Sequence, residues 1–155
     1  MNRQICKLAI RTGVAAAVGL QSGAGNAQTP DGAYRGRIVC EKIEIARDIV
    51  NVPFDLIVRG QTVQFARPVF NLRGGLFGSE LGSGTVGSDG KMDLKATRVF
   101  LGQTVESEYS GTVTATGGTL SGKQSWHGSN GAGSRNCHVA LVPAPRAMQA
   151  TAKQQ

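Results

Sequence analysis

The sequence predicts an all-β fold: an antiparallel meander of seven or eight short strands that forms a small barrel or sandwich, preceded by an N-terminal signal peptide. The first observation is 22 glycines in 155 residues, about twice the average share. The second is a charged fraction of 17%, below the usual ~25%. The third is a series of short runs in which apolar and polar residues alternate between turn residues. This composition argues against a helical bundle and excludes coiled coils and long-helix proteins.

The first 27 residues have the features of a secretory signal peptide. Three cations, Arg3, Lys7 and Arg11, precede a short apolar segment, and small residues at Gly25 and Ala27 suit a cleavage site. The apolar segment is too short for a transmembrane helix, which needs ~20 residues. An amphipathic transit peptide fits less well, because the serine enrichment of such peptides is missing. We therefore expect a periplasmic or secreted mature protein.

The chain divides into a signal peptide at 1–27, a β-domain at 28–142 and a disordered tail at 143–155. After signal removal, 14 Lys and Arg oppose 10 Asp and Glu, which leaves a net charge of +4. The cations are not clustered, so we expect no nucleic-acid partner. We also expect no membrane span in the mature chain.

Two cysteines remain after signal removal, Cys40 and Cys137. In an oxidising compartment such a pair predicts a disulfide, here between the beginning and the end of the domain. Closing a loop of ~100 residues contributes up to ~4.7 kcal/mol in the chain-entropy model. The alternative is a pair of buried free thiols.

In the first half of the domain, apolar residues alternate with polar ones in three runs. Their apolar positions are Tyr34, Ile38 and Cys40, then Phe54, Leu56 and Val58, then Val63 and Phe65. The stretch from Cys40 to Val50 suits either one or two helical turns or an irregular loop. At Pro68 the apolar phase shifts toward Phe70, which predicts a bulge or an edge strand.

The second half shows the same alternation more clearly. Asp89-Gly90 predicts a hairpin turn, and Gly117-Gly118 predicts another. The apolar positions of the strands beside them are Met92, Leu94 and Ala96, then Val105, Tyr109 and Val113, then Leu120 and Trp126, and finally Cys137, Val139 and Leu141. Glu106 and Glu108 are expected to face outward in a field of Lys91, Lys95 and Arg98, where cross-strand ion pairing is the default.

Motifs that carry chemistry are scarce. The run from Gly82 to Gly87 spells G-x-G-x-x-G, but another strand follows it instead of the helix that dinucleotide binding requires. No serine has the G-x-S-x-G context of hydrolases. The only histidines are His127 and His138, and with two oxidised cysteines they cannot form a four-ligand zinc site without carboxylates. We therefore expect no metal, no cofactor and no catalytic site.

The stretch from Trp126 to Asn136 is the best candidate for a binding site. We expect a glycine-rich loop here, at one end of the barrel, where binding residues commonly collect. Trp126 offers a flat apolar surface, Arg135 a fork of donors, and the other candidate side chains donors and acceptors. The candidate residues are Trp126, His127, Asn130, Arg135 and Asn136. The alternative for Trp126 is a simple role as a core anchor.

The sequence also resembles two groups of known proteins. The layout from Asp31 to Gly36 leading to Cys40, with Gly122, Gly133 and Cys137 before Ala140-Leu141-Val142, resembles a loose group of small exported β-proteins common in alphaproteobacteria. This resemblance implies an exported β-domain and brings no activity with it. Gly32-Ala33-Tyr34 is also similar to the G-x-W opening of lipocalin-like and avidin-like barrels, with tyrosine in place of tryptophan.

We interpret the chain as a non-enzymatic binding or structural module of the cell envelope. Its partner would be an envelope protein or a small ligand. One alternative is a calycin-like carrier that holds a small molecule inside the barrel, near Tyr34 and Trp126. Another is a hydrolase that uses His127, because triads are recognised by geometry and not by sequence order.

Overall fold

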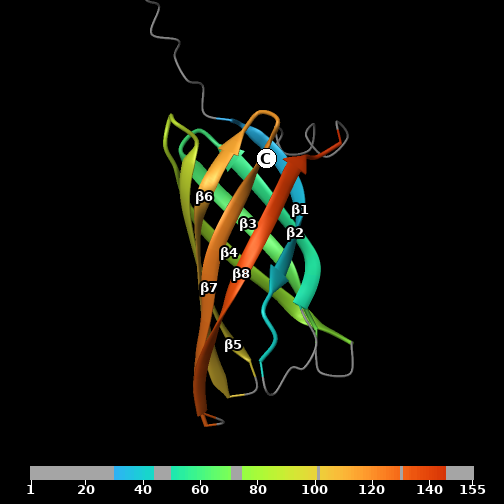
Figure 1. Cartoon of the computed structure of the whole chain (residues 1–155), viewed down its shortest axis with the longest axis vertical. Helices are drawn as coiled ribbons and strands as arrows, with labels where there is room; N and C mark the ends of the chain where they lie inside the picture. Colours follow the sequence, from blue (N-terminus) through green and yellow to red (C-terminus); the bar gives the residue numbers. More distant parts are fainter. Residues whose placement is uncertain (1–29, 44–49, 71–74, 101, 130, 146–155) are drawn as a thin grey trace, which may run out of the picture.

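Eight antiparallel strands form a closed barrel in which each strand pairs with the next and β1 pairs with β8 (Figure 1). The computed structural model describes residues 30–43, 50–70, 75–100, 102–129 and 131–145. The strands are β1 Gly32–Cys40, β2 Val50–Arg59, β3 Thr62–Phe70, β4 Leu76–Val86, β5 Lys91–Phe100, β6 Gln103–Thr114, β7 Gly117–Gly128 and β8 Gly131–Pro143. The predicted all-β meander is confirmed, with eight strands closed into a barrel. The predicted signal peptide and the stretch 44–49, for which a helical turn was one expectation, lie outside the described residues.

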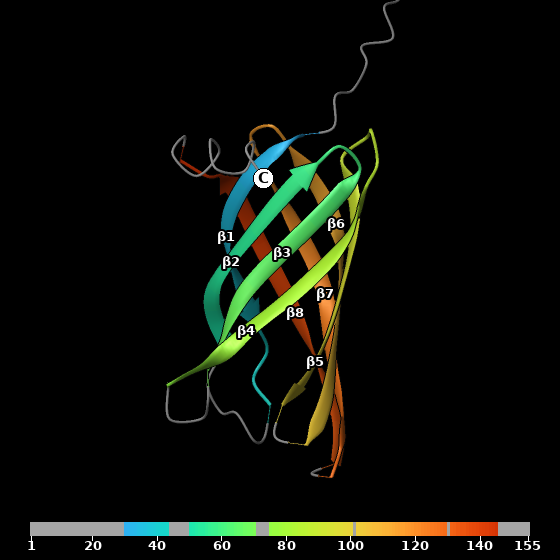
Figure 2. The ribbon, with the colours of Figure 1, turned by 180° about the vertical axis from the view of Figure 1, so that it is seen from behind.

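The barrel has two different ends (Figures 1 and 2). At the upper end the described chain begins and finishes, and three tight connections join β2 to β3, β4 to β5 and β6 to β7. The predicted Asp89-Gly90 turn lies here, and Gly90 adopts a φ of 78°, which favours glycine. The lower end carries the other four connections, and β5 to β8 extend further there (Figure 2).

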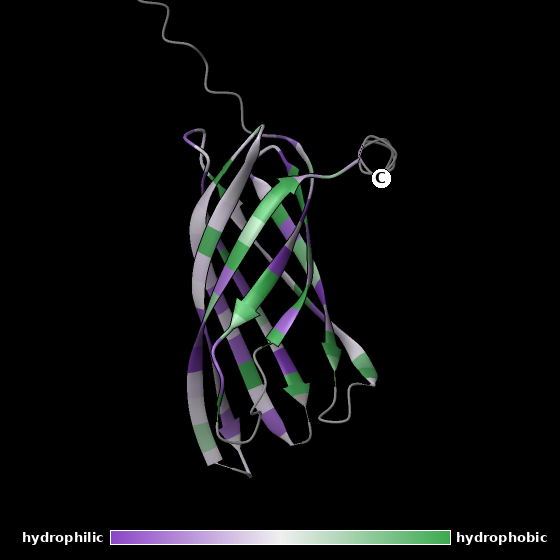
Figure 3. Ribbon diagram, turned by 45° about the vertical axis from the view of Figure 1, so that its right-hand side comes forward, coloured by the Kyte–Doolittle hydropathy of each residue, from purple (hydrophilic) through white to green (hydrophobic). Residues whose placement is uncertain are grey.

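Buried and exposed positions alternate along the strands, so side chains point in turn to the inside and the outside of the barrel. Figure 3 shows the hydropathy of the residues along each strand. The upper half of the interior is apolar. There Phe54 stacks on Phe65 with ring centroids 4.9 Å apart. Tyr109 meets both rings edge-on, at 5.9 and 5.7 Å. The three rings belong to one continuous core that also includes Tyr34.

Inward-facing glycines make room for the largest side chains. Three aromatic residues are register partners of glycines on the next strand: Phe65 with Gly82, Tyr109 with Gly122 and Trp126 with Gly133. A Cβ atom added at Gly82 would lie 2.1 Å from Cε1 of Phe65 and 2.6 Å from the backbone oxygen of Lys95. The high glycine content therefore serves packing in a narrow barrel as well as turns.

A disulfide between Cys40 and Cys137 covalently links the first strand to the last. The two residues are register partners in the β1–β8 pair, and their Cα atoms are 4.0 Å apart. Both side chains are buried. The predicted disulfide is confirmed, and it joins the strands at the point where β1 ends and β8 continues toward the lower end.

Two ladders stop before their strands do. Toward the lower end, the last pair between β4 and β5 is Ser83 with Lys95, and the last pair between β2 and β3 is Asp55 with Ala66. We call the interval between Ser79–Gly82 of β4 and Ala96–Val99 of β5 the β4–β5 seam. Figure 2 shows β4 and β5 diverging below the seam.

The break predicted near Pro68 is present in a different form. The register between β3 and β4 shifts between Val69 and Phe70, as a bulge does. The expected change of apolar phase is wrong, because Val69 is buried and Phe70 is exposed. The interior-facing positions of β3 therefore stay odd-numbered to its end.

The expected glycine-rich loop after Trp126 is also wrong. Strand β7 runs to Gly128 and β8 begins at Gly131, so only two residues separate them. The ladder between them runs from Gly128–Gly131 to Gly118–Leu141. Backbone hydrogen bonding along this ladder outweighs the low strand propensity of the glycines, because propensity is weaker than sheet context.

Reducing the disulfide should destabilise the barrel. We expect Cys40→Ala to lower the free energy of unfolding by about 2–5 kcal/mol, because the unfolded chain regains the freedom of a long loop. Urea denaturation under non-reducing conditions measures this. Wild-type protein treated with a reductant should match the variant. Equal stability of oxidised and reduced protein would contradict the closure role.

Gly82→Ala should destabilise the barrel by about 1–3 kcal/mol, because the added methyl group overlaps the Phe65 ring and the Lys95 carbonyl. Gly78→Ala is the matched control on the same strand, since nothing lies within 4 Å of its added Cβ. We expect that control to be neutral within ~0.5 kcal/mol. Thermal unfolding of the two variants side by side tests the packing argument, and equal melting temperatures would refute it.

Candidate functional site

The lower half of the barrel interior is polar and carries charge. The alternation that buries Val63 and Phe65 on β3 also turns Arg67 inward, and β4, β5, β7 and β8 likewise turn polar side chains inward toward their lower ends. We call the resulting group the arginine cluster: Arg67 on β3, Glu80 on β4, Arg98 on β5, Gln124 on β7 and Arg135 on β8. These residues come from five strands and are brought together only by closure of the barrel.

Glu80 is the central acid of the arginine cluster. Its Oε2 atom accepts hydrogen bonds from Nη2 of Arg67 and, at 2.9 Å, from Nε of Arg98. The side chains of Glu80 and Arg67 are only 1% and 3% exposed, whereas that of Arg98 is 17% exposed. Within the part of the chain that the structure describes, Oε1 of Glu80 and Nε of Arg67 are buried and have no hydrogen-bond partner. Buried polar atoms in this state leave binding capacity unused.

Gln124 connects the other side of the cluster to the core. Its Nε2 group donates to the Tyr109 hydroxyl at 3.0 Å and to Oγ of Ser107 at 3.2 Å. Its Oε1 atom accepts two bonds from Arg135, from Nε at 2.9 Å and from Nη2 at 2.7 Å. Arg135 therefore directs its fork at a neutral amide, although a carboxylate or phosphate suits that geometry better.

Positive charge exceeds negative charge in the arginine cluster. Within the described part of the chain, three arginines face a single carboxylate there. Burial, together with the charges of Arg67 and Arg98, lowers the pKa of Arg135 to about 10. Burial also lowers the pKa of Arg98, although the charge of Glu80 opposes it. Because the cations repel one another in a partly dry environment, an added anion would be attracted.

Burial raises the pKa of Glu80, but the charge of Arg67, hydrogen bonding from Ser107, and the charge and hydrogen bond of Arg98 together outweigh burial and hold it below the ordinary value of 4.5. Glu80 is therefore ionised at neutral pH. The two arginines need that ionised form, since a buried cation without a counter-ion is strongly unfavourable.

The structure brings together two of the residues predicted to bind a ligand. Trp126 lies two positions after Gln124 on the same face of β7, half-buried, and Arg135 belongs to the arginine cluster. Tyr34 is near the other end of the barrel, where its hydroxyl donates to the Pro30 carbonyl at 2.6 Å. Trp126 and Tyr34 therefore do not share one site.

The remaining predicted residues face elsewhere. His127 is exposed near the end of β7. Asn136 is exposed on β8 and donates to both carboxylate oxygens of Glu41, at 3.1 Å each. Asn130 lies outside the described residues. The described members of the predicted set are thus divided between the interior and the outer surface of the barrel.

Sequence reasoning missed Arg67, Glu80, Gln124 and the inward position of Arg98. The prediction that Arg98 faces outward beside the lysines is wrong, because Arg98 continues the phase of Met92, Leu94 and Ala96. The same signal is present for Arg67, which follows Val63 and Phe65 in phase. Counting every second position along each run places Arg67 and Arg98 on the inward face. The polarity of the two side chains, taken alone, suggests the outward face instead.

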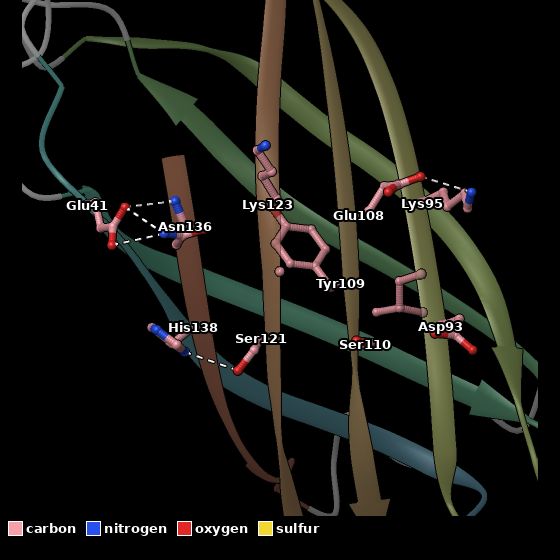
Figure 4. Close-up of a pocket in the computed structure, with 12 residues that line it drawn as sticks. Glu41, Asp93, Lys95, Glu108, Tyr109, Ser110, Ser121, Lys123, Asn136 and His138 are labelled. Carbon is pink, nitrogen blue, oxygen red and sulfur yellow. Dashed lines mark hydrogen bonds and ion pairs between the residues drawn. The ribbon is translucent and has the colours of Figure 1, made fainter. Parts of the chain in front are cut away.

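A second concave surface lies outside the barrel, on the outer face of β5 to β8 (Figure 4). This outer groove has a volume of about 740 Å³. Its polar groups pair with one another: Lys95 with Glu108 at 2.9 Å, and Nδ1 of His138 with Oγ of Ser121 at 3.1 Å. The Lys95–Glu108 pair confirms the expected cross-strand pairing of Glu108. Because most of its groups are already satisfied, the outer groove is the weaker candidate.

The residues described lack two further features, a metal-binding group and a membrane-spanning helix. They contain no group of three or more His, Cys, Asp or Glu side chains placed to hold a metal ion. They also contain no helix long and apolar enough to cross a membrane. The G-x-G-x-x-G run lies in β4 and the turn after it, and β5 follows.

Replacing Glu80, the central acid of the arginine cluster, should destabilise the folded protein. Glu80→Gln leaves two arginines without their counter-ion, so we expect a loss of about 3–5 kcal/mol in unfolding free energy at pH 7. Because the pKa of Glu80 is lowered in the folded state, its contribution is present above pH 4.5 and is lost as the pH falls through the folded-state pKa. The variant and the wild type should therefore converge in acid.

The matched control for that variant is Glu108→Gln, which breaks an ion pair whose side chains are 77% and 67% exposed. We expect it to change stability by less than ~1 kcal/mol. Urea unfolding from pH 3 to pH 7 compares the three proteins. Similar losses in both variants would show that Glu80 is not a buried counter-ion.

Comparison with known proteins assigns no family to this chain. No protein-family model, curated protein or solved structure matches it. The arginine cluster is therefore the basis on which a function can be assigned.

Proposed function

We propose that the protein is an exported, non-enzymatic binding module that holds an anionic group, such as a carboxylate, sulfate or phosphate, at the arginine end of its barrel. The observation that carries this proposal is the fork of Arg135, which is held in place by the neutral amide of Gln124. An oxyanion would give that fork a charged acceptor.

The energetics of the cluster support a binding role over a structural one. A buried ion group is weak evidence for stability, because apolar residues of similar volume often stabilise a protein more. Here the upper half of the barrel already supplies a continuous apolar core. Arginines that continue the inward phase of β3, β5 and β8 therefore add charge where stability does not need it. Cations whose pKa is lowered by burial and by neighbouring cations, as for Arg98 and Arg135, are candidates for a binding site.

The side chains of the arginine cluster differ in their exposure to solvent. Arg67 and Glu80 are almost fully buried, whereas Arg98 retains 17% exposure and Arg135 is half-buried. An anion arriving from the lower end would meet Arg98 and Arg135 first. Trp126 lies on the same side of the interior and offers an apolar surface next to Arg135, across the β7–β8 pair. A ligand with an anionic group attached to a flat or apolar body suits these neighbours.

The disulfide supports an oxidising location for this activity. Disulfides persist in the periplasm and outside the cell and are rare in the cytosol. Together with the features of residues 1–27, this favours an envelope or secreted protein. The anionic ligand would then be a small molecule or a group on another envelope component.

Anion titration tests the proposal. We expect sulfate to bind wild-type protein and Arg135→Gln to weaken that binding at least tenfold, because the fork of donors is lost. Arg37→Gln is the matched control, since Arg37 is exposed on the outside of β1 and contacts Asn51. Two-dimensional NMR at constant ionic strength, with chloride as the reference salt, provides the affinities. Equal sulfate affinity in all three proteins would exclude the arginine cluster as the site.

A further inference from the structure

The β4–β5 seam is a place where sheet edges are left open. Below Ser83–Lys95, no pair joins Ser79–Gly82 of β4 to β5 among the described residues. The other edge of β4 remains paired with β3 along this stretch, and β5 remains paired with β6. The seam therefore presents backbone donors and acceptors in the direction in which a further strand would bind.

Apolar side chains gather around this seam. Leu81 on β4 and Val99 on β5 are 69% and 73% exposed. Five of the seven large hydrophobic residues exposed in the described chain lie on β4, on β5 or on the adjoining end of β3: Phe70, Leu76, Phe77, Leu81 and Val99. Open edges are normally protected by lysines or prolines. The outward positions of β4 from Phe77 to Thr85 carry no charge.

A hollow of about 350 Å³ lies beside the seam, over the paired strands β3 and β4. It is lined by Gln64 and Phe65 of β3 and by Leu81, Gly82 and Ser83 of β4. Leu81 gives this hollow an apolar side, whereas Gln64 and Ser83 give it a polar one.

The inner side of the seam is charged. The Arg98 and Glu80 side chains span it with a 2.9 Å ion pair, and Arg67 lies behind Glu80. A side chain that points inward from the seam would therefore face the arginine cluster, with its excess of positive charge. One that points outward would lie beside Leu81 and Val99.

We propose that the seam binds an extended segment of a partner protein, which pairs with the edge of β4 at Ser79–Gly82 and alternates an inward acidic side chain with outward apolar ones. The period of two along a strand gives this alternation directly. The inference rests on the proposed function, because the inward acid is the anionic group that the arginine cluster receives. Charge complementarity selects a partner over a second copy of the chain, since the β4 strand of a second copy carries Glu80, which is already bonded to two arginines.

A synthetic peptide tests the seam directly. The probe is acetyl-Lys-Val-Thr-Val-Glu-Val-Thr-Val-Lys-amide with a fluorescent label, and its partner probe has Gln in place of Glu. We expect the acidic peptide to bind the purified protein at least tenfold more tightly by fluorescence anisotropy. Amide hydrogen exchange at Ser79–Gly82 should slow when it binds.

Two lysine variants locate the binding surface. Leu81→Lys should weaken peptide binding at least tenfold, because it puts a charge on the apolar flank of the open edge. Val142→Lys, on the outside of β8, should stay within twofold of wild type. The two side chains are 69% and 61% exposed, so neither change disturbs the core.

Several outcomes overturn the inference: no peptide binding, equal binding of the Gln peptide, or equal binding to Leu81→Lys. A dimer in sedimentation experiments that Leu81→Lys abolishes, and that the peptide does not compete with, would assign the seam to a second copy instead. If sulfate binds at Arg135 but the peptide does not, only this inference fails. If neither binds, the proposed function fails as well.

Discussion

Closure of the sheet into a barrel places every second side chain in an interior of fixed width, and the remaining features follow from how that interior is filled. Phe65 fits because its register partner is Gly82. The Cys40–Cys137 disulfide secures the β1–β8 pair that completes the circle. Under closure, a strand cannot turn one residue outward without shifting its whole register. The register that buries Phe65 on β3 therefore buries Arg67 too.

The interior divides into an apolar and a charged half at Tyr109. Its ring packs edge-on against Phe54 and Phe65, and its hydroxyl accepts a hydrogen bond from Gln124. Gln124 in turn accepts a hydrogen bond from Arg135. Apolar burial in the upper half provides the main driving force for folding. The lower half can therefore hold charged side chains that a barrel with a smaller apolar core would exclude. Glu80 lowers the cost of this buried charge by neutralising Arg67, the most deeply buried arginine of the cluster.

The fold could be predicted from the sequence because alternation, turn glycines and an even cysteine pair are local or countable signals. The strand count, the Asp89-Gly90 turn and the disulfide follow from them. The arginine cluster could not be predicted in the same way, since its members come from five strands and meet only when the barrel closes. Charged residues usually face solvent, and this favours an outward Arg98. The better guide is that Arg98 lies in phase with the buried Leu94 on the same strand. Glycine is rare in strands, which favours a loop after Trp126, whereas here Gly133 provides the space beneath that ring.

The open seam and the charged interior are two consequences of the same divergence of strands. Where β4 and β5 stop pairing, backbone hydrogen bonds no longer close the wall, and only long side chains reach across. Arginine and glutamate have that reach, and leucine or valine in their places would leave the wall open without any bridge. Such a bridge of ions can exchange partners, since a carboxylate from outside offers Arg98 the same geometry as Glu80. An apolar bridge has no equivalent exchange. The charged pair therefore closes this part of the barrel in a way that an anionic partner is able to replace.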